Sequence, residues 1–497
     1  MPTRLHPATA VVDTLTYGVQ VGSTGFFLGM LAMGADATGV EGVFLLAAVG
    51  LVLGAGYGLA RWLAFGYAVE DGTLRIVSGV LRRREREIPL GRVQNVDVQR
   101  GVLQRLFGLA ELRVETAGGS GTEATLAVVS DDEAARLQGR LGGGGDAAVT
   151  APAPDADGAP DQAPLFRLGR RELAAYVLTE FRPGTLLVVV LGGPLVGPVV
   201  ADLLLAAAAP LGGPERLAWQ TLTADEAIAL ALVSIPAAVV GAWVLGAALA
   251  YNGYRGFVLA ERGSDLAYRR GLLTEYSGTI PLARVQTVTL RENPLQRVLG
   301  FAGLTVDTAG YAGEEAGNSG RRSAVPMADR ERALALVRHL EGVDAGRAFT
   351  RPPRRARRRY AVRYALAVAA VTAAAYVDAR SLGGFSLWWP PALLFAAVPP
   401  AAHLTWANRG HVDAGDHLLV QSGFWRRRTV VVPHDRLQTV HRSRTVFQRR
   451  RALADVVADT ASGAVLRGGG AVVHDLDDGD AAALASRLRA ALDDRGG

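Results

Sequence analysis

The sequence predicts a multi-pass membrane protein in which three α-helical hairpins, six spans in all, alternate with three α+β domains. Each domain is expected to be a small antiparallel β-barrel or sandwich with a C-terminal helix. Two features of the 497 residues carry this prediction. Apolar runs of spanning length occur in pairs, and a polar segment with alternating apolar residues follows each pair. Hydrophobic residues make up 49% of the chain and mean hydropathy is positive, which also favours membrane spans.

Each apolar run is long enough for a helix to cross a bilayer, which takes about 20 residues. The runs are Leu15–Met33 with Val43–Phe65, Leu186–Ala208 with Ala227–Tyr251, and Tyr360–Val377 with Leu387–Ala407. No small-residue cleavage site follows the first run, so we interpret it as a retained span rather than a signal peptide. Four prolines, Pro390, Pro391, Pro399 and Pro400, are expected to kink the last run.

Arginine marks one side of the three hairpins. The short connections inside the pairs carry few arginines, whereas the outer flanks are rich in them, most densely at RPPRRARRRYAVR (Arg351–Arg363). Because cytoplasmic flanks carry an excess of basic residues, both termini and all large polar segments are expected on the cytoplasmic side of a cell membrane.

The polar segments repeat one another three times without a gap. A Pro, an Arg, two Gln and a Thr recur at a constant offset. These framework residues are Pro89, Arg92, Gln94, Gln104 and Thr116; Pro281, Arg284, Gln286, Gln296 and Thr308; and Pro433, Arg436, Gln438, Gln448 and Thr460. The chain is therefore a triplicated module of one hairpin and one cytoplasmic domain.

The repeated domain is composed mainly of strands. YAVEDGTLRIVSG has two alternating apolar runs around an Asp71-Gly72 turn, which predicts a β-hairpin. VLQRLFG predicts one or two turns of helix, LAELRVETAG another strand, and DDEAARLQGRL a closing helix with an Asp cap. GGGGDAAVTAPAPDADGAPDQAP lacks periodicity and predicts a disordered linker.

These assignments divide the chain into eight parts. They are hairpin 1 (1–65), domain 1 (66–141), the disordered linker (142–164), hairpin 2 with a basic lead-in (165–255), domain 2 (256–341), a basic linker (342–359), hairpin 3 (360–409) and domain 3 (410–497).

The repeated motif resembles a known family. IPL-x-R-[VL]-Q followed by LQR-x-x-G and a strand ending in T-A-G is similar to the bacterial pleckstrin-homology (PH) domain of membrane proteins, in the subclass where a two-helix hairpin precedes each PH-like domain. The third copy departs from the motif, with Arg450-Arg451-Ala452 in place of Leu106-Phe107-Gly108. Either that copy lost the surface used by the others, or its short helix is solvated or faces lipid.

Composition argues against several kinds of chemistry. The chain has no Cys and no Lys, which excludes thiolate metal sites, Cys nucleophiles and Schiff bases. Five of the eight His lie in domain 3, but none of them has metal-ligand spacing. No nucleotide-binding loop or nucleophile elbow is present. We therefore expect no enzyme activity, no metal and no cofactor.

Arginine clusters are the candidates for lipid or partner binding. They are Arg82, Arg83, Arg84 and Arg86 in domain 1, Arg354, Arg355, Arg357, Arg358 and Arg359 before the fifth span, and Arg426, Arg427 and Arg428 in domain 3. Basic clusters beside a span attract anionic headgroups, but they also serve as topological anchors. The framework Arg and Gln have a structural alternative, which we favour: satisfying backbone carbonyls at a strand–loop junction. Aromatic residues are not interleaved with the arginines, which disfavours nucleic acid.

Gly50, Gly54 and Gly58 form a small-residue stripe on the second span, where it permits close packing against the first span or another subunit. We expect a non-enzymatic membrane scaffold whose PH-like domains bind partner proteins, each other or anionic lipid headgroups. The alternative is a transport or envelope-stress component that uses the six spans.

Overall fold

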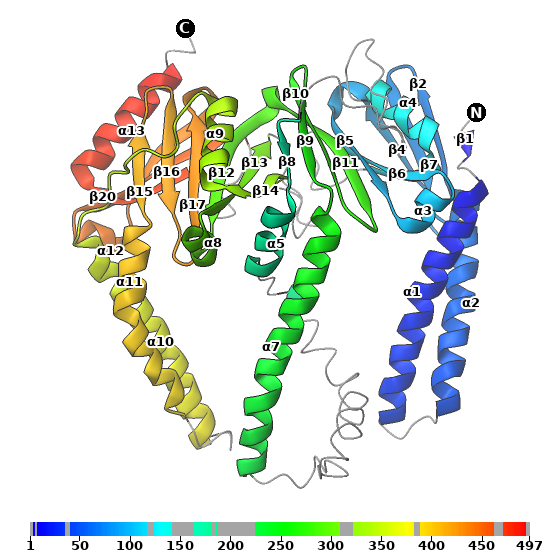
Figure 1. Ribbon diagram of the computed structural model, residues 1–497, viewed down its shortest axis with the longest axis horizontal. Coiled ribbons are helices and arrows are strands. Elements are labelled where there is room, and N and C mark those ends of the chain that lie inside the picture. The colour runs from blue at the N-terminus through cyan, green and yellow to red at the C-terminus, as the bar shows by residue number, and fades with distance from the viewer. Residues whose placement is uncertain are drawn as a thin grey trace.

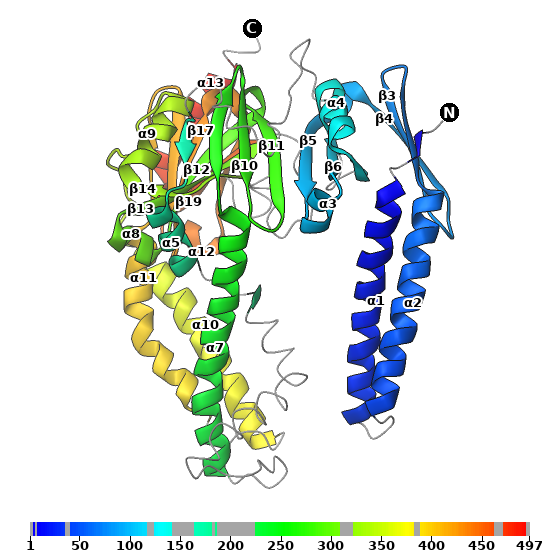
Figure 2. The same cartoon turned by 45° about the vertical axis from the view of Figure 1, so that its right-hand side comes forward.

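The computed structural model describes residues 3–4, 7–34, 40–116, 124–141, 164–180, 184–185, 224–308, 322–381, 388–461 and 471–493. Three β-rich modules lie side by side, and the long helices extend from them toward one side (Figures 1 and 2). Most of the disordered linker predicted at 142–164, and the span predicted at Leu186–Ala208, lie outside the described residues.

All three modules share one order of elements: three strands, a 3-10 turn, a strand, a short helix, two strands and a closing helix. Module 1 contains β2 (Gly66–Glu70), β3 (Thr73–Ser78), β4 (Arg84–Pro89), η1 (Leu90–Arg92), β5 (Val93–Arg100), α3 (Val102–Leu106), β6 (Leu109–Thr116), β7 (Ala124–Ser130) and α4 (Asp131–Leu141).

Modules 2 and 3 repeat this order. Module 2 contains β9 (Val258–Arg262), β10 (Asp265–Arg270), β11 (Glu275–Pro281), η3 (Leu282–Arg284), β12 (Val285–Glu292), α8 (Pro294–Leu299), β13 (Phe301–Thr308), β14 (Arg322–Asp329) and α9 (Arg330–Glu341). Module 3 contains β15 (Gly410–Asp413), β16 (His417–Ser422), β17 (Arg427–Pro433), η5 (His434–Arg436), β18 (Leu437–Ser443), α12 (Val446–Arg449), β19 (Leu453–Thr460), β20 (Ala471–Asp477) and α13 (Asp478–Asp493).

Each module buries apolar residues between its first three strands, its last three strands and its closing helix. In module 1, Leu74 and Ile88 from the first set share a core with Leu112 from the second and Leu137 from α4. The alternation seen in the sequence places one face of each strand in this core. The predicted hairpin turn is present, with Asp71 and Gly72 both at positive φ. The α+β class and the antiparallel strands are confirmed.

The sheets do not stop at the module boundaries, a feature that the sequence did not predict. β5 of module 1 pairs with β11 of module 2, which gives a seven-stranded sheet, and β12 of module 2 pairs with β17 of module 3, which gives a six-stranded sheet. The last three strands of one module and the first three of the next thus form one antiparallel sheet. The modules are consequently open sandwiches rather than closed barrels, because β5 and β12 pair with the next module instead of closing their own.

Charged side chains cross the boundary between modules 2 and 3. Glu292, at the end of β12, is almost fully buried and forms ion pairs with Arg427 of β17 at 2.7 Å and with Arg330 at 3.1 Å. Glu341, at the end of α9, lies 3.6 Å from the imidazole of His417 on β16. Burial raises the pKa of Glu341 to about 7, with Asp435 adding to the rise and Arg436 opposing it.

The segment before each hairpin returns to the first sheet of its module. β1 (Thr3–Arg4) pairs with β2, β8 (Phe166–Arg167) pairs with β9, and Thr350 forms a bridge with His411 of β15. Both ends of each hairpin are thereby attached to the same sheet. The β8 segment continues into α5 (Arg170–Thr179).

The structure supports three of the six predicted spans. Among the described residues, three helices are long and apolar enough to cross a membrane: Glu41–Ala64 in α2 (Val40–Ala64), Pro236–Tyr254 in α7 (Ala224–Tyr254) and Ala356–Arg380 in α10 (Ala356–Ser381). α1 (Pro7–Gly34) is long enough but carries more polar residues. The last predicted run is divided into η4 (Pro390–Ala397) and α11 (Val398–Ala407), as expected where prolines remove helical hydrogen bonds.

The glycine stripe of α2 faces α1. A Cβ atom at Gly50, Gly54 or Gly58 would lie 2.6, 2.2 or 2.6 Å from a backbone oxygen of α1. The first of the two alternatives for this stripe, packing within the hairpin, is therefore the one observed.

We expect the raised pKa of Glu341 to make stability fall as pH rises. The folded state holds a proton between the ordinary pKa of 4.5 and about 7, so the stabilisation is complete below pH 4.5 and lost by about pH 7. Glu341→Gln should remove a pH-dependent difference of about 3 kcal/mol. Thermal unfolding of both proteins in nanodiscs from pH 4.5 to 8 measures it.

The difference between the two curves is the relevant quantity, because His417 titrates in the same range. Burial, with help from His434, lowers the pKa of His417, which acts in the opposite direction on the wild-type curve. Parallel curves for wild type and Glu341→Gln would refute the assignment.

Candidate functional site

One end of every module combines a short helix with the turn between its second and third strands. α3, α8 and α12 lie at the end of each module that faces the long helices (Figure 1). The framework glutamine folds back at each short helix: the side-chain oxygens of Gln296 and Gln448 accept the backbone N–H of Asn293 and Thr445 at 2.8 and 2.9 Å, and Gln104 does the same for Gly101. This capping arrangement gives the matched glutamines a structural role.

The turn is fixed to the end of a long helix. In module 2 the backbone N–H groups of Leu272 and Leu273 donate to the backbone and side-chain oxygens of Asn252, near the end of α7, at 2.8 and 2.9 Å. In module 3 the Asn408 side chain donates to the carbonyl of Phe424 at 3.1 Å, just beyond α11. The turn therefore lies at the level where the long helices leave the modules.

These turns and short helices expose large apolar side chains, which we call the apolar rim. Its members are Val80, Leu81, Val102, Leu103, Leu106 and Phe107 in module 1, Leu272, Leu273, Leu295, Val298 and Leu299 in module 2, and Phe424, Trp425, Val446 and Phe447 in module 3. Leu81 is 98% exposed and Val298 is 85% exposed. All other exposed large hydrophobic residues of the described chain lie on α1, α2, α5, α7, α10 or the segment 388–407.

An arginine of each short helix stands beside the rim, and in two modules it reaches the next module. Arg105 of α3 donates to the carbonyls of Leu272 and Leu273 at 3.0 and 3.3 Å. Arg297 of α8 donates to the side chain of Asn408 at 2.9 Å, which in turn holds the next turn. The corresponding Arg449 of α12 is exposed.

The third copy retains its rim despite the departures noted in the sequence. Arg450 and Arg451 replace two apolar residues. Val446 and Phe447 are nevertheless exposed on α12, and Phe424 and Trp425 are exposed on the equivalent turn. Ala452 keeps the left-handed conformation of its glycine counterparts, with φ of 48° against 62° at Gly108 and 75° at Gly300.

The predicted arginine clusters have different environments. Arg82, Arg83, Arg84 and Arg86 are exposed at the start of β4, and Arg354, Arg357 and Arg358 are exposed at the start of α10. Others are occupied within the protein: Arg427 with Glu292, Arg426 with Glu180 at 3.2 Å, Arg355 with Asp477, and Arg359 with Asp475. Arg428 pairs in register with Arg291 across the boundary between modules 2 and 3.

The remaining framework residues lie at equivalent joints of the fold. Pro89, Pro281 and Pro433 end the third strand and precede the 3-10 turn, which ends at Arg92, Arg284 and Arg436. Gln94, Gln286 and Gln438 lie near the start of the fourth strand of each module. The fifth strand ends at Thr116, Thr308 or Thr460, and these residues pair in register with Val93, Val285 and Leu437 of the fourth strand.

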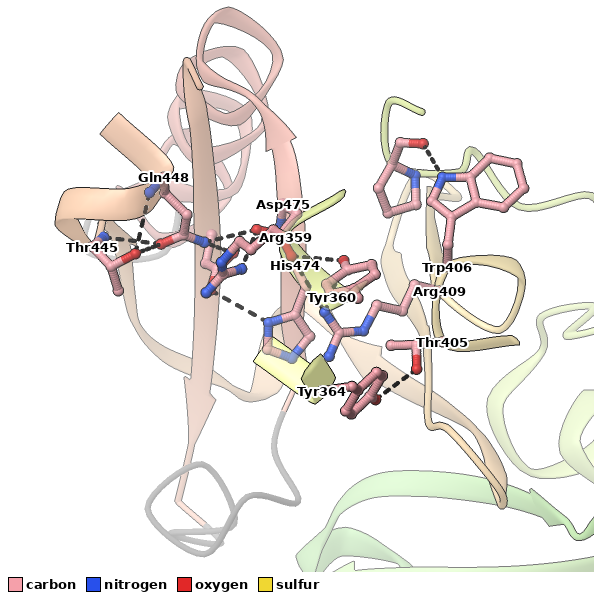
Figure 3. A network of polar contacts seen from close by, with 12 residues as sticks. Arg359, Tyr360, Tyr364, Thr405, Trp406, Arg409, Thr445, Gln448, His474 and Asp475 are labelled. Carbon is pink, nitrogen blue, oxygen red and sulfur yellow. Dashed lines mark hydrogen bonds and ion pairs between the residues drawn. The ribbon is translucent and has the colours of Figure 1, made fainter. Parts of the chain in front are cut away.

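A polar network joins the third hairpin to module 3 (Figure 3). Asp475 of β20 is 0% exposed and forms ion pairs with Arg359 of α10 and with Arg409, the latter at 3.3 Å. It also accepts hydrogen bonds from Tyr360 at 2.6 Å and from Gln448 at 3.0 Å. One buried carboxylate thus connects α10, Arg409 just beyond α11, and the short helix α12.

A second carboxylate extends this network. Asp455 accepts from Gln448 at 2.6 Å and lies 3.4 Å from a ring nitrogen of His474. Burial acts to raise the pKa of Asp455, but the hydrogen bond and charge of His474 outweigh it and lower the pKa. Sequence analysis missed Asp475 because modules 1 and 2 have apolar residues at that position; the signal was one acid inside the apolar strand AVVHDLD.

The residues that the structure describes contain no group of three His, Asp or Glu side chains placed to hold a metal ion. The five histidines of module 3 are dispersed, with His417 near Glu341, His434 near Asp413 and His474 near Asp455.

Comparisons with known proteins agree with this architecture. The sequence profile of the family described as "Bacterial PH domain" matches residues 24–144, 200–343 and 364–492. The chain is 24% identical over 481 residues to the UPF0699 transmembrane protein YdbT of Bacillus subtilis (strain 168), with 93% of each chain covered. No solved structure matches it significantly.

Ala452→Gly should stabilise the protein by about 1 kcal/mol, because a non-glycine residue in the left-handed conformation costs roughly 1–2 kcal/mol and glycine offsets part of this gain by its greater freedom when unfolded. Chemical denaturation in detergent micelles measures the change. The opposite substitution at the matched position, Gly300→Ala, should destabilise; stabilisation by both would contradict the argument.

Asp475→Asn should destabilise module 3 by about 3 kcal/mol, since it leaves Arg359 and Arg409 without their buried counter-charge. The matched control is Arg355→Ala, which breaks the more exposed pair with Asp477 and should cost less than about 1 kcal/mol. Differential scanning calorimetry compares the two variants. Equal losses would show that the buried carboxylate has no special role.

Proposed function

Because the chain belongs to the bacterial PH domain family, whose profile matches it three times, we propose that it is a non-enzymatic membrane scaffold that holds three PH-like domains against the bilayer surface. The apolar rims enter the interfacial region of the membrane, and the neighbouring arginines contact anionic headgroups. The transmembrane protein YdbT, to which the whole chain is similar, supports the membrane location.

The observation that carries this proposal is the position of the exposed apolar side chains. Soluble surfaces seldom gather such residues in contiguous patches. Here they occur in all three modules, on the turn and short helix that adjoin the long helices. The opposite turns, such as Asp71-Gly72 and Gly263-Ser264, are polar. A bilayer that receives the long helices would therefore meet the rim and no other face of the modules.

The free energy of inserting the rims into the membrane interface is favourable. Full burial of a Leu or Phe side chain contributes about 1.5–3 kcal/mol, and a basic residue near an anionic surface about 1 kcal/mol. Three partly inserted rims with Arg82, Arg83 and Arg84 nearby are sufficient to hold the modules on the membrane. The hairpins supply the anchoring, so the rims fix orientation rather than provide affinity.

The six-span topology is part of the proposal. α1 packs along α2 through the glycine stripe, and its 28 residues rise about 42 Å. η4 and α11 together rise about 30 Å, close to the hydrocarbon thickness. α11 also contacts α10, with the Tyr364 and Thr405 hydroxyls 2.7 Å apart. Arginines beside the module ends of the hairpins favour a cytoplasmic location for the modules.

Label depth tests this proposal, and the absence of cysteine makes it direct. Single cysteines in place of Leu81 and Val298 on the rim, and of Ser264 on the opposite turn, carry a nitroxide spin label in nanodiscs of phosphatidylcholine and phosphatidylglycerol. We expect the two rim labels to be accessible to oxygen and protected from a water-soluble nickel chelate, because apolar side chains partition into the interface.

The label at position 264 serves as the control and should be accessible to the chelate. A deeper position for the rim labels in anionic than in neutral nanodiscs would support headgroup contacts by the arginines. If all three labels proved equally aqueous in both lipids, membrane docking of the modules would be refuted.

A further inference from the structure

The two boundaries between modules are built in the same register. At the first, Glu275 of β11 stands opposite Arg100 of β5; at the second, Arg427 of β17 stands opposite Glu292 of β12. These are equivalent positions in the repeat, and both boundaries place opposite charges there. Opposite charges directly across strands stabilise a pairing, and like charges destabilise it.

The residue on the fourth strand has an internal partner at the start of the closing helix in every module. Arg100 pairs with Asp131 at 2.7 Å, and Arg444 pairs with Asp478 at 3.0 Å. In module 2 both signs are reversed, as Glu292 pairs with Arg330 at 3.1 Å. The two charges of this ion pair can therefore be interchanged between the strand and the helix without a change of fold.

β18 is the third copy of this edge, and within the described chain it pairs with β19 alone. His441, Arg442 and Ser443 are exposed, whereas Thr289 and Leu290 at equivalent positions of β12 are buried by β17. Arg449 is exposed as well, although Arg105 and Arg297 hold the turn of the incoming module. The edge thus retains Arg444 and Arg449 at the positions whose counterparts receive a strand and a turn at the two internal boundaries.

β4, the counterpart in module 1 of the incoming strands β11 and β17, does not complement β18. In the shared register, Arg83 of a second copy would stand opposite Arg444, which places like charges where both internal boundaries have opposite ones. Only Glu85, opposite Arg442, would be favourable. A second copy docked through β4 is therefore a poor occupant.

We propose that the open edge of β18 docks an extended strand of another protein that carries a carboxylate opposite Arg444. The strand adds antiparallel to β18 by main-chain hydrogen bonds, as in other β-augmentation sites, and the carboxylate selects it. A turn preceding that strand offers carbonyl groups to Arg449. This site goes beyond the membrane docking proposed above and does not depend on it.

The test uses a hairpin taken from the chain itself as the probe. A cyclised peptide of Asp265–Pro281 contains the acidic strand with Glu275 and the turn that Arg105 contacts, and its Glu275→Arg counterpart reverses the selecting charge. Hydrogen exchange of the full-length protein in nanodiscs should show protection of β18 by the net-neutral Glu275 peptide at concentrations at least about fivefold lower than by the basic Glu275→Arg peptide. β12, already paired, is the internal control.

A charge-exchanged variant separates selection from general attraction. Arg444→Glu combined with Asp478→Arg reproduces the arrangement of Glu292 and Arg330 in module 2, and Arg442→Leu is included because Arg442 also pairs with Asp478 and its counterpart in module 2 is Leu290. This variant should prefer the basic peptide. Protection by both peptides alike, by neither, or without reversal in the variant would overturn the proposal.

A disulfide between copies tests the other occupant. Arg83→Cys and Arg444→Cys in two differently tagged copies should not cross-link in shared nanodiscs under mild oxidation. Efficient cross-linking would assign the edge to a second copy instead. Neither result alters the label depths that test membrane docking, so the two proposals fail independently.

Discussion

The arrangement of the whole protein depends on one constraint, the pairing of each module's fourth strand with the third strand of the next. An unpaired strand edge leaves backbone N–H and C=O groups open to any other strand. Here β5 pairs with β11 and β12 pairs with β17, so the modules share continuous sheets and are not independent domains joined only by linkers. Because both boundaries use the same register, the relation of module 1 to module 2 is repeated between modules 2 and 3.

The position of the hairpins follows from this repetition. Each hairpin enters and leaves its module through the first sheet, where β1, β8 and Thr350 pair with the strand that follows the hairpin. Modules in a constant side-by-side relation therefore send their long helices to the same side, as Figure 2 shows. The turns at the helix ends, held by Asn252 and Asn408, then lie on that side too, and the rim is a consequence of the same geometry.

Sequence reasoning succeeded where the information is local. The Asp71-Gly72 turn, the alternating strands and the closing helices follow from short-range patterns. The glutamines were expected to satisfy backbone carbonyls, whereas Gln296 and Gln448 accept from backbone N–H groups at the start of the short helices. The joined sheets were not predictable, because strands pair through backbone groups that are the same in every strand. Only single charges such as Glu292 distinguish one partner from another. Asp475 was missed for a related reason. Its partners Arg359 and Arg409 are far away in sequence, and Arg359 lies in an arginine-rich segment that is typical of an exposed surface.

The reversal of charge in module 2 disfavours particular wrong pairings between three similar modules. If module 1 met module 3 directly, Arg100 would stand opposite Arg427; if the fourth strand of module 2 met the third strand of a second module 2, Glu292 would stand opposite Glu275. Both pairings place like charges across a partly buried strand pair, where they are costly. The succession 1, 2, 3 places Glu275 opposite Arg100 and Glu292 opposite Arg427. The same rule would also accept Glu292 opposite Arg83 and Arg444 opposite Glu275, so the charges exclude some wrong pairings and the order of the modules along the chain selects among the rest.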